Sequence, residues 1–178
     1  AALPWERGGV RAPSAIAREG RVWLAYEAGG AIGLATSADG ERFEREPEPV
    51  LRQDPAHQES APLAEPALAI TPEGSFALAY ASGGALFVAT APTARGPWTR
   101  VGSGPIATPG PAPEGGLESL GDPALVIERT PAGRAIWALA ATARTDARGP
   151  SAIVGFGSFD GVTFERAARP LYSERAAA

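Results

Sequence analysis

The chain contains no cysteine, no methionine, no lysine and no asparagine among its 178 residues. Without cysteine it forms neither a disulfide nor a thiolate metal site, and without asparagine it has no N-glycosylation acceptor. The single histidine, His57, cannot by itself supply the nitrogen ligands that a transition metal requires. We therefore predict no metal and no cofactor, while the redox compartment stays open.

Long apolar runs and clustered positive charge are also absent. No apolar stretch approaches the roughly 18 residues of a membrane span, so no membrane span is predicted. All sixteen basic residues are arginine, and twenty acidic residues leave a net charge of −4. Because no basic run can follow a phosphate backbone, nucleic acid is not an expected partner.

Glycine and proline are abundant instead, with 22 and 18 residues respectively. They fall between short apolar runs, which is typical of many short strands joined by turns. No window shows a helical period. The hydrophobic content of 44% is enough for the core of one folded domain. These features predict an all-β fold.

One sequence pattern occurs three times along the chain. Each copy begins with a proline followed by small and β-branched apolar residues, at Pro13, Pro66 and Pro123. Two further apolar runs, a turn and a closing aromatic and basic segment follow each proline. The prolines are 53 and 57 residues apart, and four short strands per repeat are typical of β-propeller blades.

The predicted architecture is a single β-propeller domain over residues 1–178 with three four-stranded antiparallel blades. The blades are expected at about residues 10–52, 63–107 and 120–172. Residues 3–8 are interpreted as the closing strand of a preceding blade, because Trp5-Glu6-Arg7 matches Phe164-Glu165-Arg166. Three blades cannot close a ring. We expect the chain to be part of a larger propeller, or to complete its ring by self-association.

The repeats resemble the blades of a known enzyme class. The segments are GRVWLAYE, AIGLATSADGERF and ALFVATAPTARGPWTR, at residues 20–27, 31–43 and 85–100. They are similar to the five-bladed propeller glycoside hydrolases of the arabinanase and xylosidase type (family 43) and to their fructosidase relatives. The resemblance implies a five-bladed propeller, carbohydrate as partner, and carboxylates that converge on the axis to hydrolyse a glycosidic bond.

The position before each blade-opening proline holds the candidate catalytic residues. It is occupied by Ala12, Glu65 and Asp122. By resemblance Glu65 matches the general acid, although the small residue usual between that acid and the proline is missing. Asp122 matches the Asp-Pro start that supplies the base or a modulator of the acid. The structural alternative is that an acid before proline accepts hydrogen bonds from backbone donors at the turn into the strand.

Two further residues are candidates for substrate binding. His57 lies in the connection between the first two repeats, where its ring can bond a sugar hydroxyl or simply be solvated. Glu118 lies just ahead of the third repeat. Bulky residues at strand spacing are expected to pack between blades instead: Trp23, Tyr26, Phe76, Tyr80, Phe87 and Trp137.

Two functions follow from this reading. The first is a glycoside hydrolase with paired carboxylates in the axial funnel, which the resemblance favours. The alternative is a non-catalytic glycan- or protein-binding propeller of a secreted or cell-surface protein. The alternative is favoured by Ala12 and Ser14, because the related enzymes carry an acid at each of these places.

Overall fold

The computed structural model describes residues 3–111, 118–144 and 151–173. These residues form thirteen strands and two short 3₁₀ helices, η1 (Pro4–Glu6) and η2 (Pro55–His57), and they contain no α-helix. The predicted all-β fold is confirmed.

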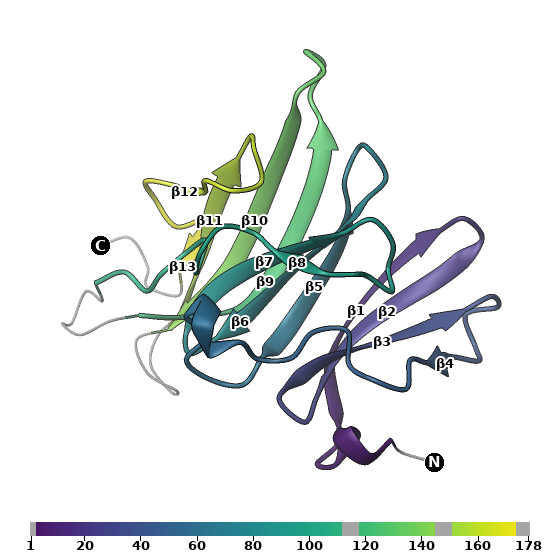
Figure 1. Ribbon diagram of the computed structural model, residues 1–178. Coiled ribbons are helices and arrows are strands. Elements are labelled where there is room, and N and C mark those ends of the chain that lie inside the picture. The colour runs from purple at the N-terminus through teal and green to yellow at the C-terminus, as the bar shows by residue number, and fades with distance from the viewer. Residues whose placement is uncertain (1–2, 112–117, 145–150, 174–178) are drawn as a thin grey trace.

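The strands form three antiparallel sheets that stand side by side, from purple through teal to yellow in Figure 1. The first blade comprises β1 (Val10–Arg18), β2 (Arg21–Ala28), β3 (Ala31–Ser37) and β4 (Glu44–Arg45). The second comprises β5 (Ala64–Ile70), β6 (Phe76–Ser82), β7 (Ala85–Ala91) and β8 (Thr99–Arg100). The third comprises β9 (Ser119–Arg129), β10 (Ala135–Arg144), β11 (Ser151–Ser158) and β12 (Glu165–Arg166). The predicted three blades of four strands in chain order are confirmed.

The chain after each fourth strand turns back onto the third strand. In the third blade this segment is β13 (Tyr172–Ser173), which pairs with β11. The matching bridges are Ile32 with Leu51, Leu86 with Ala107, and Ile153 with Tyr172. Each repeat therefore consists of four strands and a following segment that pairs with the third strand.

The hydrophobic core lies between the blades. Side chains alternate between the two faces of a strand, and β6 in the middle blade is buried along its whole length. The face that packs on the first blade carries large side chains, including Leu78, Tyr80 and Phe87. The opposite face is lined with alanines such as Ala77 and Ala79, which pack against large residues of the third blade. Leu86 and Val88 of β7 lie beside these alanines, and the first blade contributes Ile32 and Leu34 to its interface with the second.

The innermost strands of the three blades lie together. Strand β5 contacts both β1 and β9, so the first strands of successive blades are neighbours around a common axis. Any side chain presented at the same point of each inner strand is therefore brought close to its counterparts in the next blade.

Residues 3–8 differ from the prediction of a closing strand. Pro4–Glu6 form the 3₁₀ helix η1, and Glu6 is buried. Proline favours the first position of such a turn, and the Glu6 carboxylate accepts a hydrogen bond from the Leu3 backbone N–H at 2.9 Å. The segment leads into β1 of the first blade.

Glu6 belongs to a buried contact that recurs in the second blade. The Glu6 carboxylate accepts a hydrogen bond from the Tyr26 hydroxyl at 2.7 Å and from Arg45 at 2.6 Å. Two further contacts of this kind, which we call acid clasps, show that the pattern is part of the repeat. In the second blade Glu59 is held by Tyr80 and Arg100, and in the third Glu118 is held by Arg166.

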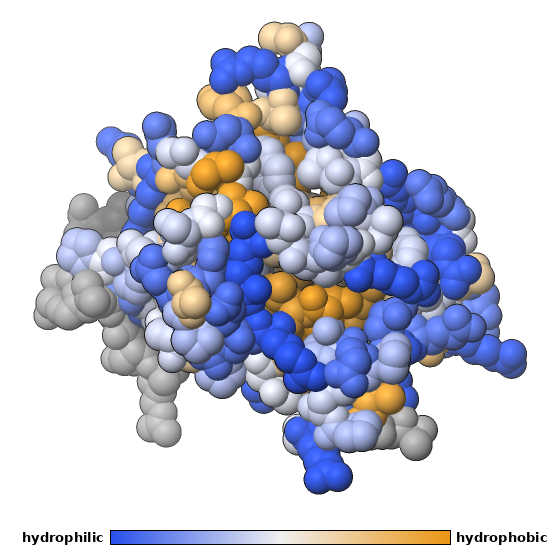
Figure 2. All heavy atoms as spheres, viewed as in Figure 1, coloured by the Kyte–Doolittle hydropathy of each residue, from blue (hydrophilic) through white to orange (hydrophobic). Residues whose placement is uncertain are grey.

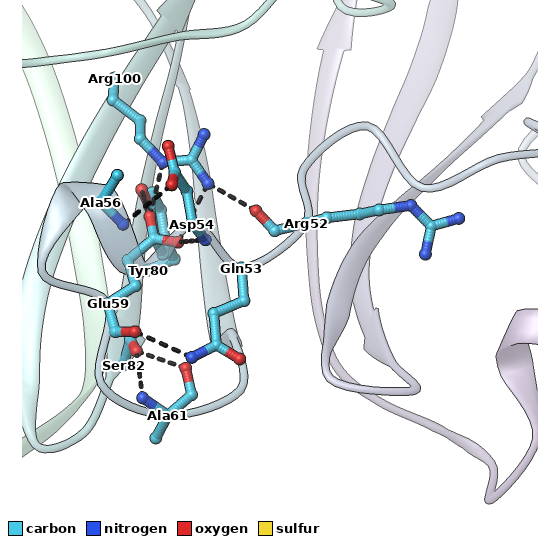
Figure 3. A network of polar contacts seen from close by, with 9 residues as sticks. All are labelled: Arg52, Gln53, Asp54, Ala56, Glu59, Ala61, Tyr80, Ser82 and Arg100. Atoms are coloured by element: carbon cyan, nitrogen blue, oxygen red, sulfur yellow. Dashed lines mark hydrogen bonds and ion pairs between the residues drawn. The ribbon is translucent and has the colours of Figure 1, made fainter.

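In the clasp of the second blade Glu59 and Tyr80 are fully buried and Arg100 is partly buried (Figure 3). Glu59 accepts hydrogen bonds from the Tyr80 hydroxyl at 2.7 Å, from Arg100 Nε at 2.6 Å and from the Asp54 backbone N–H at 2.5 Å. Burial raises the pKa of Glu59, but these donors outweigh it and hold that pKa below its usual range. The clasp fixes the connection between the first two blades to the second sheet.

We predict that Tyr80→Phe destabilises the fold by about 1 to 3 kcal/mol, because it removes a hydrogen bond from a buried carboxylate without changing the ring. The measurement is the free energy of unfolding in urea. Tyr172→Phe is the matched control, since the Tyr172 side chain is exposed. Equal effects of the two substitutions would show that the Glu59 contact contributes nothing to stability.

Candidate functional site

Each innermost strand is interrupted by a β-bulge at the residue before its proline. The pairing register shifts between Arg11 and Ser14, between Ala64 and Ala67, and opposite Ala140 and Thr142. The residues inside these bulges have left-handed backbones, with φ of 49° at Ala12, 54° at Glu65 and 47° at Asp122. Such values are uncommon outside glycine, and bulges often redirect a side chain beside an active site.

The structure brings the two predicted residues together, through the side chain of Glu65 and the backbone of Asp122. Glu65 on β5 accepts a hydrogen bond through Oε2 from the Asp122 backbone N–H on β9, at 2.6 Å. Gly121 makes this approach possible, because a Cβ at Gly121 would lie 2.7 Å from the same Oε2. Gly121, in the Gly-Asp-Pro segment of β9, thus leaves space for the Glu65 carboxylate of β5.

A third acid, Glu27, joins them from the first blade, and the sequence analysis did not identify it. Glu27 is the penultimate residue of β2, is 5% exposed, and lies opposite Arg11 in the β1–β2 register. Its Oε2 accepts a hydrogen bond from the Glu65 backbone N–H at 3.3 Å, and its Oε1 accepts one from Arg11 Nε at 2.8 Å. The sequence feature that could have identified Glu27 is its position as the one acid in the otherwise mostly apolar run RVWLAYEA.

Glu27, Glu65 and Asp122 form what we call the acid row, one residue from each blade. An arginine pairs with each end of the row: Arg11 with Glu27, and Arg144 with Asp122 at 2.7 Å. The Asp122 and Arg144 side chains are 48% and 44% exposed, so this pair is solvated and contributes little to stability. Glu65, in the centre, has a backbone N–H rather than a guanidinium as its hydrogen-bond donor.

The electrostatics of the row single out Glu65. Burial raises the pKa of Glu65, and the nearby negative charges of Asp122 and Glu27 add to that effect. The hydrogen bond from Asp122 and the charge of Arg144 oppose it only in part, so the pKa lies above its ordinary value of 4.5. A carboxyl group that keeps its proton to higher pH has the property required of a general acid.

The other two candidates occupy different surroundings. His57 lies on η2, where its ring stands 6.4 Å from the ring of Phe87 and its buried Nε2 has no hydrogen-bond partner among the described residues. Glu118 pairs with Arg166 at 2.8 Å in the clasp of the third blade. Within the described ranges, no hydrogen bond joins either residue to the acid row.

Two absences hold for the described residues, 3–111, 118–144 and 151–173. In these ranges no group of three or more His, Cys, Asp or Glu side chains is arranged so that it could hold a metal ion. The same ranges contain no helix with the length and apolarity needed to cross a membrane.

Comparison with known proteins places the fold but finds no sequence relative. No family model and no curated protein matches the chain. A structure described as a glycoside hydrolase of family 130, targeting β-1,2-mannosidic linkages in Candida mannan, has a TM-score of 0.67 and 22% identity over 93% of this chain and 52% of that one. Fructan 1-exohydrolase IIa of Cichorium intybus has a TM-score of 0.69 and 18% identity over 97% and 36%.

A third similar structure is the endo-arabinase of Bacteroides thetaiotaomicron, with a TM-score of 0.62 and 15% identity over 95% of this chain and 64% of that one. The chain spans about half or less of the length of the first structures it matches. At these identities the likeness establishes the fold. The chain has the fold of the propeller-type glycoside hydrolases, and the predicted resemblance to them is confirmed.

We predict that Glu65→Gln becomes more stable relative to the parent chain as the pH rises from 4 to 7. A raised folded-state pKa stabilises the fold below the unfolded-state value of 4.5, and this contribution is lost as the pH rises through the folded-state value. Glutamine keeps the acceptor oxygen and never ionises. The measurement is the free energy of unfolding of both chains at each pH.

Glu128→Gln is the control for this series, because Glu128 is exposed on β9. Its effect on the free energy of unfolding is expected to be small, because the side chain is solvated. If Glu65→Gln instead lost stability relative to the parent as the pH rose, the pKa of Glu65 would be lowered in the fold, and the assignment of its environment would be wrong.

Proposed function

We propose that this chain is part of a propeller that hydrolyses glycosidic bonds, with Glu65 as general acid and Asp122 as the second carboxylate. The observation that carries the proposal is the acid row. A half-buried acid with a raised pKa contacts the backbone of an exposed carboxylate on the next inner strand. The fold is similar to those of the family-130 glycoside hydrolase, the fructan 1-exohydrolase and the endo-arabinase named above. This similarity supports hydrolysis of a glycosidic bond as the reaction.

Glycoside hydrolysis requires two carboxyl groups in different protonation states. One donates a proton to the leaving oxygen, and the other activates water or attacks the sugar. Glu65 suits the first role because burial and neighbouring acids favour its protonated form. Asp122 suits the second role because it is half exposed and is paired with Arg144. Its carboxylate is therefore accessible to a substrate or a water molecule.

Glu27 acts in this scheme as a positioning residue. Its negative charge helps to raise the pKa of Glu65, and its carboxylate accepts the hydrogen bond from the Glu65 backbone N–H inside the bulge. The ion pair with Arg11 holds the Glu27 side chain in place. Glu27 thus supports both the direction and the protonation of the proposed acid.

A binding propeller is the second candidate function, and one observation favours it. Ala12 occupies the same left-handed bulge position as Glu65 and Asp122 but carries no functional group. A funnel with two acids at three such positions can bind hydroxyl-rich ligands without hydrolysing them. In either case we propose a carbohydrate partner and a secreted or cell-surface protein.

The test is a panel of arabinosides, xylosides, fructosides and β-1,2-mannosides with the longest natural polypeptide that contains this chain. Glu65→Gln and Asp122→Asn are each expected to lower kcat by about 100-fold or more, as loss of acid or base catalysis does. Glu128→Gln, outside the acid row, is expected to keep the parent rate. Turnover that survives both substitutions would remove these carboxylates from the mechanism. Glycan binding without any turnover would favour the binding propeller.

Gly121→Ala is expected to reduce kcat while leaving the fold intact. The added Cβ would meet Glu65 Oε2 at 2.7 Å, and the end of a flexible side chain can move away at little cost in stability. The displaced acid then donates its proton less effectively, and the pH profile of kcat shifts. Kinetics and urea unfolding are measured in parallel.

Gly157→Ala is the matched control for this substitution. A Cβ at Gly157 meets no atom within 4 Å, so kcat and the free energy of unfolding are both expected to stay at the parent level. An active enzyme with unchanged kinetics in Gly121→Ala would mean that the position of the Glu65 carboxylate does not matter to the reaction.

A further inference from the structure

The core between neighbouring blades is apolar. Buried side chains of two adjoining blades form each interface, and Figure 2 shows apolar side chains, in orange, near the centre of the view between the first and second blades. Hydrophobic contact is non-directional, so it restricts the displacement of one inner strand along the next less strictly than a hydrogen bond does. Hydrogen bonds that cross between blades are therefore suited to set the position of the acid row.

The start of β9 is attached to the second blade by two such hydrogen bonds. The Leu120 N–H donates to the Gly84 carbonyl oxygen at 2.9 Å, and the Asp122 N–H donates to Glu65 Oε2 at 2.6 Å. Both donors lie on β9, and both acceptors belong to the second blade. The Gly84 carbonyl therefore fixes β9 two residues ahead of the point where Glu65 meets it.

The start of β5 is attached to the first blade in the same way. The Leu63 N–H donates to the Gly30 carbonyl oxygen at 3.0 Å, and the Glu65 N–H donates to Glu27 Oε2 at 3.3 Å. Each attachment thus combines one backbone carbonyl with one carboxylate oxygen of the acid row. A hydrogen bond to a carboxyl group changes in strength when that group gains or loses its proton. The bond to the backbone carbonyl does not depend on that proton.

Both carbonyls come from a two-residue turn made of two glycines. Gly29-Gly30 joins β2 to β3 and Gly83-Gly84 joins β6 to β7, and all four residues have positive φ, from 55° to 79°. Tight hairpin turns of this kind favour glycine, asparagine and aspartate. A Cβ on the second glycine would lie 2.9 Å from Pro62 Cβ in the first turn and 3.2 Å from Ser119 Oγ in the second. The segment that leads into the next inner strand therefore packs directly on each turn.

We propose that these two glycine turns are positioning elements for the acid row. Each turn holds the start of the next inner strand by a bond that is independent of the protonation of Glu65, so Asp122 stays in place whether Glu65 keeps or donates its proton. This role rests on the proposed function, in which Glu65 is the general acid and Asp122 the second carboxylate. Gly30 and Gly84 act only through the acids that they position.

Gly84→Asn tests the turn that holds β9. Asparagine adopts positive φ more readily than most residues, and its side chain requires space that Ser119 occupies, so the start of β9 is displaced. The hydrogen bond from the Asp122 N–H lowers the pKa of Glu65 and outweighs the opposing effect of the Asp122 charge. Loss of this bond is therefore expected to raise that pKa. A site that is merely loosened would admit water, which lowers the pKa by relieving burial.

The measurement is a carbon-13 NMR titration of the Glu65 carboxyl group in the longest natural polypeptide that contains this chain, with Glu65→Gln to identify the resonance. The titration midpoint is expected to move to higher pH in Gly84→Asn. A smaller movement in the same direction is expected in Gly84→Ala, whose methyl group approaches the Ser119 hydroxyl. In Gly84→Asn kcat is expected to fall by about tenfold or more, and its pH profile is expected to move with the NMR midpoint.

Gly20→Asn is the matched control. Gly20 is the second residue of the two-residue turn between β1 and β2, has a φ of 70°, and would carry a Cβ that meets no atom within 4 Å. This variant repeats the backbone substitution without the contact to a neighbouring blade, so the Glu65 midpoint and kcat are expected to stay at the parent values. The charged side chains around Glu65 are the same in each glycine variant: Arg11, Glu27, Asp122 and Arg144.

The NMR and kinetic results separate failure of the positioning role from failure of the proposed function. A Glu65 midpoint that is unchanged or lowered in the Gly84 variants would overturn the positioning role, and so would an equal movement in Gly20→Asn. A midpoint that rises in Gly84→Asn, in a polypeptide that turns over no glycoside, would overturn hydrolysis and still support the turn as the element that sets Asp122 against Glu65.

Discussion

The fold depends on covering both faces of each four-stranded sheet. Large side chains such as Leu78 and Tyr80 fill one face of the middle blade, and alanines such as Ala77 and Ala79 form the other. A sheet with apolar side chains on both faces is stable only when each face packs against another layer. The middle blade meets this requirement through its two neighbours, and in the first blade Trp5 of η1 packs on Tyr26 at the outer face. In the third blade Val126 and Leu171 stay exposed. Packing therefore determines both the order of the blades and the surfaces that remain open.

Burial acts on the acids of this protein in opposite ways, depending on their hydrogen-bond donors. Glu59 is fully buried, yet Arg100, Tyr80 and a backbone N–H lower its pKa. Burial raises the pKa of Glu65, the charges of Asp122 and Glu27 add to that effect, and the one backbone N–H donor opposes it only in part. The first environment suits a structural anion and the second suits a proton donor. The donors around each carboxylate, more than the extent of its burial, separate the clasps from the proposed site.

The bulge before each blade-opening proline connects the fold to this site. It places one residue of every inner strand in a left-handed backbone at the same point of the blade. Since β5 contacts both β1 and β9, that residue lies near its counterparts in neighbouring blades. The hydrogen bond between Glu65 and Asp122, which are 57 residues apart, follows from this repetition. The same geometry is present at Ala12, where the side chain has no chemical function.

The period of apolar residues, the turn residues and the three prolines by themselves determined the strands, the blades and the positions of Glu65 and Asp122, because these are local patterns that repeat. Only the tertiary structure decided that Glu27 joins the acid row, that Arg11 and Arg144 pair with its ends, and that residues 4–6 form a turn of 3₁₀ helix. The Glu27 contact with Glu65 joins residues 38 positions apart in different blades. It depends on how one blade is rotated against the next, and that rotation comes from side-chain packing across the interface, which no local pattern encodes.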